Sequence, residues 1–173
     1  AIGLFVSPIL IVIALFVYLS ATAEAQHVAF RDGAKDLPVC EAAVTSLEIL
    51  PPAATLADAV DLLMRSSQTE FPVVDGGRRP RGLLTKDALI RALAGDDPDA
   101  PVLDIMIRDI PIVSRRAPLD VSLAELTKSG APALFVVDDA GGFVGLLTPE
   151  NVGELMLVRA VRPDWPLGRR ARA

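Results

Sequence analysis

The N-terminal end of the chain is a long apolar run without charge. Ile2–Leu19 contains no charged residue, and a helix of that length is roughly 27 Å long, close to the ~30 Å hydrocarbon thickness of a bilayer. Pro8 lies near one end of the run, where membrane helices tolerate proline. Tyr18 lies at the other edge, where an interfacial aromatic residue belongs. The pattern predicts a transmembrane helix over residues 1–20.

Two other structures compete for this segment. Ala21-Thr22-Ala23 resembles the cleavage site of a secretory signal peptide, but such peptides have a shorter apolar stretch of about 7–15 residues and a basic segment before it. A helix buried in a protein core would need apolar partners on all sides, which a domain of this size hardly supplies. Residue 1 is alanine rather than methionine, and we expect that part of a membrane domain precedes it.

Residues 21–36 are rich in helix formers and predict a helical linker that ends near Gly33. Arg31 and Lys35 lie beyond the end of the apolar run, and the positive-inside rule therefore places this side of the helix in the cytoplasm. We expect a protein of the cell membrane that has the lipid bilayer as a partner and its remaining residues in the cytoplasm.

Beyond the linker, one pattern of apolar and polar positions occurs twice at an offset of 63 residues. Pro38–Leu93 aligns on Pro101–Met156 without a gap. The closest matches are Val73-Val74-Asp75 with Val136-Val137-Asp138 and Gly82-Leu83-Leu84-Thr85 with Gly145-Leu146-Leu147-Thr148. Such a repeat indicates one supersecondary unit present twice, because a single unit of this size has too little core to be stable alone.

Each copy predicts the same order of elements: a helix, a short strand, a turn, a second strand and a final helix. In the first copy the expected elements are Thr55–Arg65, Phe71–Val74, 75–77, Arg81–Leu84 and Lys86–Ala94. In the second copy they are Leu119–Lys128, Ala133–Val137, Asp139–Gly142, Phe143–Leu147 and Glu150–Val158. Two copies stacked sheet to sheet would bury the apolar faces of both.

These features resemble two CBS domains in tandem, an arrangement called a Bateman module. The resemblance rests on the strand that ends in Val-Val-Asp, the turn after it, and the Gly-Leu-Leu-Thr sequence before a helix, each present twice. It implies an α/β (α+β) CBS-pair fold with pseudo-twofold symmetry, preceded by one transmembrane helix. The expected domains are the membrane helix 1–20, the linker 21–36, the first repeat 37–97, the second repeat 100–160 and a flexible basic tail 161–173.

The apolar segment and its Ala/Glu-rich continuation are similar to the C-terminal end of the membrane domain in site-2-protease-like (M50 family) zinc metalloproteases. Ser7-Pro8 stands where that family tends to have Asn-Pro. The family's metal-binding His-Glu-x-x-His motif is absent from the chain, so no catalytic residue is carried over and zinc is expected only in a preceding part of the protein. The resemblance implies a cytoplasmic regulatory module of a membrane-embedded zinc metalloprotease.

CBS pairs that sense adenine nucleotides share a G-h-x-h-T/S-x-x-D/N pattern, in which Thr or Ser contacts phosphate or ribose and the acid or amide holds the ribose hydroxyls. The resemblance gives these roles to Thr148 and Asn151 of the second repeat. The first repeat has Thr85, but Ala88 stands three residues later. Asp87 comes one residue early, and on a helix its side chain is rotated by about 100°. We expect one competent site at most, with AMP or ATP as candidate ligands.

Helix capping competes with this ligand hypothesis. Both Thr148-Pro149-Glu150 and Thr85-Lys86-Asp87 are also sound helix starts, with threonine as the N-cap and an acid in the first turn. Arg115 and Arg116 follow an expected strand and are candidate contacts for a phosphate. Such a pair is more often solvated surface.

Composition removes several function classes. The formal net charge is −5 and no long basic block precedes the extreme C-terminus, whereas nucleic-acid binding depends on a basic face. One histidine and one cysteine are too few for a self-contained zinc site or a disulfide framework. Two further functions stay open beside the protease module: a regulatory tail of a membrane transporter or channel, and a ligand-free dimerisation module. We expect a homodimer formed through the CBS repeats.

Overall fold

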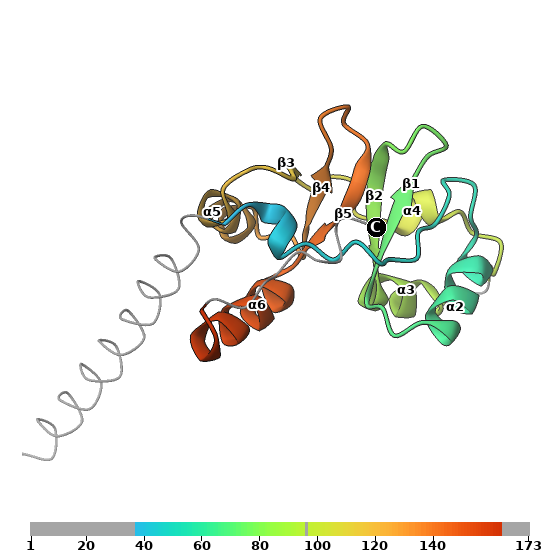
Figure 1. The fold of residues 1–173 in the computed structure, drawn as a ribbon. Helices are drawn as coiled ribbons and strands as arrows, with labels where there is room; N and C mark the ends of the chain where they lie inside the picture. Colours follow the sequence, from blue (N-terminus) through green and yellow to red (C-terminus); the bar gives the residue numbers. More distant parts are fainter. Residues whose placement is uncertain (1–36, 96, 164–173) are drawn as a thin grey trace, which may run out of the picture.

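The computed structural model describes residues 37–95 and 97–163 (Figure 1). The predicted membrane helix, the linker and most of the basic tail lie outside these residues. Within them, no helix is long and apolar enough to cross a membrane. The membrane helix, the linker and the tail therefore stay predictions.

Each repeat contains the helices and strands that its apolar pattern predicts, with bounds that differ by no more than three residues. The first repeat has α2 (Leu56–Arg65), β1 (Glu70–Val74), β2 (Pro80–Thr85) and α3 (Lys86–Ala92). The second has α5 (Leu119–Ser129), β4 (Leu134–Val137), β5 (Phe143–Leu147) and α6 (Pro149–Val161). Three short elements complete the described part of the chain: η1 (Val39–Glu41), α4 (Val102–Ile105) and β3 (Ile112–Ser114). The two short helices η1 and α4 were not predicted.

The strands form two sheets of related topology. β1 and β2 are antiparallel, while in the second sheet β3 runs parallel to β4 and β4 is antiparallel to β5. Leu50 makes a parallel bridge to Val73, and Val113 of β3 pairs with Val136 in the same way at the 63-residue offset. The first sheet thus has the topology of the second, except that the strand matching β3 is reduced to the single bridge at Leu50.

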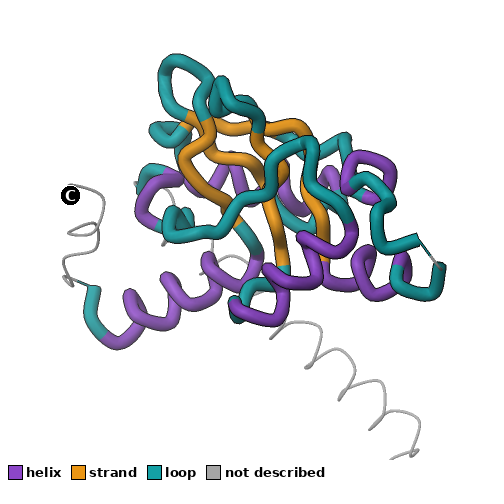
Figure 2. Tube along the Cα trace, turned by 90° about the vertical axis from the view of Figure 1, so that its right-hand side faces the viewer, coloured by secondary structure: helices purple, strands orange, loops and turns teal. Residues whose placement is uncertain are grey.

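The two sheets pack against each other, as the repeat predicted. Their strands lie together in the middle of the molecule, while the helices lie mainly around and below them (Figure 2). An apolar cluster joins the sheets and contains Val74 and Leu83 from the first together with Phe135, Phe143 and Leu146 from the second. The two phenylalanine rings meet edge to face, with centroids 5.8 Å apart. This contact is favourable beyond the area that it buries.

Each repeat receives a short segment from the start of the other. Val44, which lies between η1 and α2 near the start of the first repeat, bridges to Leu146 in the second repeat. Ile107, in the corresponding place near the start of the second repeat, bridges to Leu83 in the first. The 63-residue offset relates the two bridges, so the exchange is reciprocal. A structural unit therefore differs from a contiguous repeat of the sequence, and neither repeat has a complete core without the other.

The glycine of the repeated Gly-Leu-Leu-Thr sequence makes this exchange possible. A β-carbon on Gly145 would lie 2.3 Å from the carbonyl oxygen of Val44. A β-carbon on Gly82 would lie 2.5 Å from Met106 Sδ and 2.8 Å from the carbonyl oxygen of Ile107. Only glycine lets the exchanged segment approach the strand this closely.

Candidate functional site

Thr85 and Thr148 are helix caps, as predicted. The Thr85 hydroxyl accepts a hydrogen bond from the backbone N–H of Ala88 (3.2 Å) at the start of α3. The Thr148 hydroxyl accepts one from the backbone N–H of Asn151 (3.2 Å) at the start of α6. Each cap satisfies a backbone donor that would otherwise have no partner in the helix. A capping threonine can still meet a ligand with its remaining hydrogen-bonding capacity.

In the second repeat, Thr148 and Asn151 also bond to each other through their side chains. The Thr148 hydroxyl donates to Asn151 Oδ1 (2.7 Å), so the hydroxyl both donates to and accepts from the same residue. Both residues are half-buried. A ribose hydroxyl that sought Oδ1 would have to displace this internal bond.

In the first repeat, Thr85 lies beside an open cavity of about 520 Å³. Cavities that bind small molecules commonly have volumes of roughly 300–1,000 Å³. Residues of both repeats line it: Thr69, Glu70, Thr85, Lys86, Asp87, Arg91, Ile107, Gly130 and Pro132. The predicted pair Thr148 and Asn151 does not belong to this lining.

The charges around this cavity differ from those at the matching place in the second repeat. Lys86 and Arg91 bring two cations to its edge. The positions 63 residues later hold Pro149 and Glu154. Glu70 and Asp87 of the same lining offset these two cations, so the cavity is formally neutral. The start of α6 instead carries Glu150 and Glu154 with no cation at the matching positions. An anionic ligand therefore meets less repulsion beside α3 than beside α6.

The sequence analysis expected Asp87 to point away from the first site. The expectation that it misses the ligand stays a prediction. Asp87 lies in the exposed first turn of α3 and is among the residues that line the cavity. The first repeat therefore has an acceptor for hydroxyl groups in spite of its departure from the nucleotide pattern.

Arg115 and Arg116 lie away from the predicted pair. Arg115 follows β3, and its backbone N–H donates to Val137 at the end of β4 (2.9 Å). Arg116 forms an exposed ion pair with Asp139 (3.1 Å). Thr148 is near the opposite end of β4, which is four residues long and spans about 13 Å. The structure therefore does not bring the two arginines together with Thr148 and Asn151.

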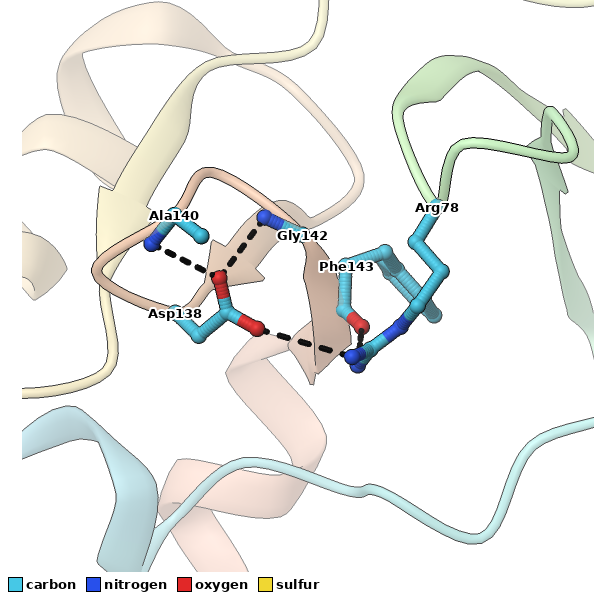
Figure 3. A network of polar contacts seen from close by, with 5 residues as sticks. All are labelled: Arg78, Asp138, Ala140, Gly142 and Phe143. Carbon is cyan, nitrogen blue, oxygen red and sulfur yellow. Dashed lines mark hydrogen bonds and ion pairs between the residues drawn. The ribbon is translucent and has the colours of Figure 1, made fainter.

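At the end of the sheets that carries the β-hairpin turns, one polar network joins the two repeats (Figure 3). Arg78, in the turn between β1 and β2, donates through Nη2 to the carbonyl oxygen of Phe143 (2.7 Å). Its Nη1 lies 3.6 Å from Asp138 Oδ2. The Asp138 carboxylate also accepts from the backbone N–H groups of Ala140 (3.0 Å) and Gly142 (2.8 Å). No sequence motif indicated this network.

The same hydrogen bonds lower the pKa of the Asp138 carboxyl below its ordinary value. The backbone N–H of Gly142 is the largest cause, and the N–H of Ala140 and the positive charge of Arg78 add to it. Desolvation acts in the opposite direction and is outweighed. The carboxyl is thus held in its charged form, which is the form that Arg78 binds.

The family model of the CBS domain matches this chain twice, over residues 36–95 and 102–157. Similar solved structures include CBSX2 in complex with AMP, with 24% identity, a TM-score of 0.60 and coverage of 69% of this chain and 96% of that chain. The CBS domain pair of MJ0100 in complex with 5′-methylthioadenosine and S-adenosyl-L-methionine has 21% identity, a TM-score of 0.63 and coverage of 71% and 98%. At such identities the likeness shows the fold.

Curated relatives match over part of their length. The magnesium and cobalt efflux protein CorC of Escherichia coli K12 is 29% identical over 105 residues, which are 60% of this chain and 35% of CorC. The homoserine O-acetyltransferase of Methanocorpusculum labreanum is 29% identical over 98 residues, which are 57% of this chain and 20% of that protein. The chain thus spans about a third or less of the length of these relatives.

Proposed function

Since this chain belongs to the CBS-domain family, we propose that it is a regulatory module that binds an adenine nucleotide between its two repeats. The observation that carries the proposal is the cavity of about 520 Å³ beside Thr85, because both repeats line it and two cations stand at its edge. The AMP complex of CBSX2 and the adenosine-derived ligands of MJ0100 support the choice of ligand class.

The phosphate of the nucleotide is proposed to bind beside α3. Lys86 and Arg91 supply positive charge, and guanidinium groups bind phosphate through paired hydrogen bonds. The hydroxyl of Thr85, the N-cap of α3, adds a polar group to the same lining. This arrangement places the charged end of the ligand on the first repeat.

The nucleoside is proposed to extend toward the second repeat. Asp87 can accept hydrogen bonds from a ribose diol. Ile107 and Pro132 offer apolar surface to the adenine ring from the side of the second repeat. Because the ligand would touch both repeats, its binding would depend on how the repeats are packed. A ligand that prefers one packing shifts the module toward it, which is the means of regulation.

Thr148 and Asn151 form the alternative position for the ribose and phosphate. Their spacing fits the family pattern, but their side chains already bond to each other. Glu150 and Glu154 add negative charge at the start of α6. We therefore propose that an anionic nucleotide prefers the first repeat.

Calorimetric titration of the full 173-residue chain with AMP and ATP tests this proposal, with Arg91→Gln and Asn151→Ala as paired variants. Loss of one charged hydrogen bond is expected to weaken binding in Arg91→Gln by about tenfold. Asn151→Ala should bind like the wild type. Binding that disappears only in Asn151→Ala would place the site in the second repeat. No heat and no thermal shift at millimolar nucleotide would leave a ligand-free dimerisation module.

We further propose that the module reports to a membrane protein through residues 1–36. The resemblance of residues 2–19 to site-2-protease-like metalloproteases supports a protease as the target. The CorC relative, a magnesium and cobalt efflux protein, supports a transporter as the alternative. Assays of zinc-dependent proteolysis and of metal efflux on the natural protein separate the two. We expect the chain in the membrane fraction. After removal of residues 1–20, we expect it in the soluble fraction.

We also propose that two modules assemble through their helices. Leu157 and Val161 on α6 are 71% and 82% exposed, and Met64 on α2 is 80% exposed. Leu157 and Val161 lie one turn apart on α6, and neighbouring exposed apolar residues are typical of protein contact surfaces. Sedimentation analysis should give a dimer, and Leu157→Glu should give a monomer. A monomeric wild type at high concentration would remove the proposed homodimer.

A further inference from the structure

Arg78, in the turn of the first repeat, forms hydrogen bonds with both the N–H and the carbonyl oxygen of Phe143 in the second repeat. The carbonyl oxygen of Arg78 accepts from the backbone N–H of Phe143 (2.7 Å). Its guanidinium donates to the carbonyl oxygen of the same residue (2.7 Å) and faces the carboxylate of Asp138. Phe143 in turn places its ring in the apolar cluster between the sheets. One residue thus bonds to both peptide groups of Phe143, where that cluster begins.

The backbone of Arg78 is held in a conformation that suits glycine. Its φ is 59°, and among the described residues it is the sole non-glycine residue with positive φ. The matching position of the second repeat is Gly141, with φ 78°. An arginine in this place is strained in a way that a glycine is not, and such strain persists only where the surroundings hold it. Within the turn, Asp75 holds this conformation by accepting from the backbone N–H groups of Gly77, Arg78 and Arg79. The contacts of Arg78 with the second repeat add to this support.

The Arg78 contacts and the cavity beside Thr85 lie at opposite ends of the same sheets. Glu70 at the start of β1 lines the cavity, and the turn with Arg78 follows the end of β1 at Val74. The strand is five residues long, so the two places are about 13 Å or more apart. Between them the sheets touch through apolar side chains, which attract without fixing direction. The exchanged segments add backbone hydrogen bonds between Val44 and Leu146 and between Ile107 and Leu83. The bonds of Arg78 add directional contacts at the far end of the sheets, where they can limit rotation of one sheet on the other.

We infer that Arg78 is a latch, a positioning residue that sets the angle between the two sheets and thereby the width of the cavity beside Thr85. Rotation of one sheet on the apolar cluster would move the start of β1 relative to Gly130 and Pro132, which line the other side of the cavity. That the cavity binds a nucleotide rests on the proposed function. The latch itself rests on the contacts of Arg78 alone.

Distance measurement between the repeats tests this latch. Spin labels are attached to cysteines that replace Ile90 on α3 and Lys128 on α5, both exposed. The full chain carries Cys40→Ser so that no other cysteine is labelled. Pulsed electron resonance then measures the distance between the two labels, and thus the separation of the repeats. The test variant is Arg78→Gly, which keeps the allowed backbone conformation and removes the guanidinium. The control is Arg81→Ala, which removes an exposed arginine two residues beyond the turn. Asp138→Asn is a second test variant, with Asp139→Asn as its control.

The wild type and both controls should give one narrow distance distribution. Arg78→Gly should shift or broaden it beyond the wild-type width, and Asp138→Asn should do so to a smaller extent. An Arg78→Gly distribution that coincides with the wild type would overturn the latch. Where AMP binds, its affinity should fall by about fivefold in Arg78→Gly, because fewer molecules hold the binding-competent cavity. A wild type that binds no AMP would remove the proposed function, and the distances would still decide the latch.

Discussion

In the first repeat, the threonine that starts the last helix is followed by a lysine and, five residues after that, by an arginine. In the second repeat, the matching threonine is followed by a proline and a glutamate at the same places. Both threonines cap their helices in the same way. The two repeats therefore share the backbone and the cap, whereas the charged residues that follow the cap differ.

The turns show the same kind of divergence. Arg78 and Gly141 occupy matching positions with positive φ, but only Arg78 has a side chain that reaches the other repeat. The two turns are thus alike in the backbone at this position and different in their side-chain contacts. Comparison of matching residues in the two repeats is thus a way to separate what the fold requires from what a function requires.

The largest effect on stability is expected at Gly82 and Gly145, where the exchanged segments approach the strands most closely. Gly145→Ala should lower the free energy of unfolding by about 3 kcal/mol, because the new β-carbon would meet the backbone of Val44. Gly82→Ala should cost less, about 1–2 kcal/mol, since its nearest obstacle is the flexible side chain of Met106 and the backbone carbonyl of Ile107 lies farther from the new β-carbon than that of Val44 does at Gly145. Urea denaturation measures both. Gly153→Ala on α6, where a β-carbon meets nothing within 4 Å, is the control and should be neutral or stabilising.

A smaller effect is expected at the cap of α2. Thr55 and Asp58 form a reciprocal capping box, whereas α5 begins at Pro118 without a side-chain cap. Thr55→Ala should therefore destabilise the protein by about 1 kcal/mol, and Thr55→Ser should restore most of that loss. Equal unfolding midpoints for the alanine variant and the wild type would show that the cap difference between the repeats has no energetic weight.

The strain at Arg78 predicts an unusual order of stability. Arg78→Ala loses the guanidinium bonds and keeps the unfavourable backbone conformation, while Arg78→Gly loses the same bonds and relieves the strain. The glycine variant should therefore be the more stable of the two, by about 1 kcal/mol. Thermal unfolding of both variants checks this order. An alanine variant more stable than the glycine variant would contradict the account of the turn.

The pH dependence should be the smallest effect. Because the pKa of Asp138 is lower in the folded protein than in the unfolded chain, the unfolded chain takes up the proton first as the pH falls. The carboxyl thus contributes stability above its unfolded pKa of about 3.9, and this contribution is lost as the pH falls through the folded value. Asp138→Asn should flatten this acid-sensitive step in unfolding curves. Asp139→Asn is the control for the lost charge.

The sequence predicted the elements that depend on local pattern. The offset of 63 residues identified both repeats, and the threonine caps followed from the residues next to them. The reciprocal exchange of Val44 and Ile107 was not predictable in this way, because it depends on contacts between segments far apart in the chain. The glycines of the repeated motif carried a signal of close approach, which the sequence analysis left unassigned.

The candidate site was predicted less completely. The family pattern directed attention to Thr148 and Asn151, since it considers spacing on one helix. The cavity beside Thr85 combines α3 with Ile107, Gly130 and Pro132, and no single helix reveals that combination. Arg115 and Arg116 lie at one end of β4, and Thr148 and Asn151 lie near the other end. This separation depends on the pairing of the strands, which the sequence pattern does not specify.

The most direct test of the central claim exchanges the diverged charges between the repeats. Arg91→Glu copies the second repeat onto the first, and Glu154→Arg does the reverse. Titration of the full chain with AMP should show binding to the wild type and to Glu154→Arg, and a loss of more than tenfold in affinity for Arg91→Glu. Unchanged affinity in Arg91→Glu would contradict the claim that the cations beside α3 make the first repeat the site of the nucleotide.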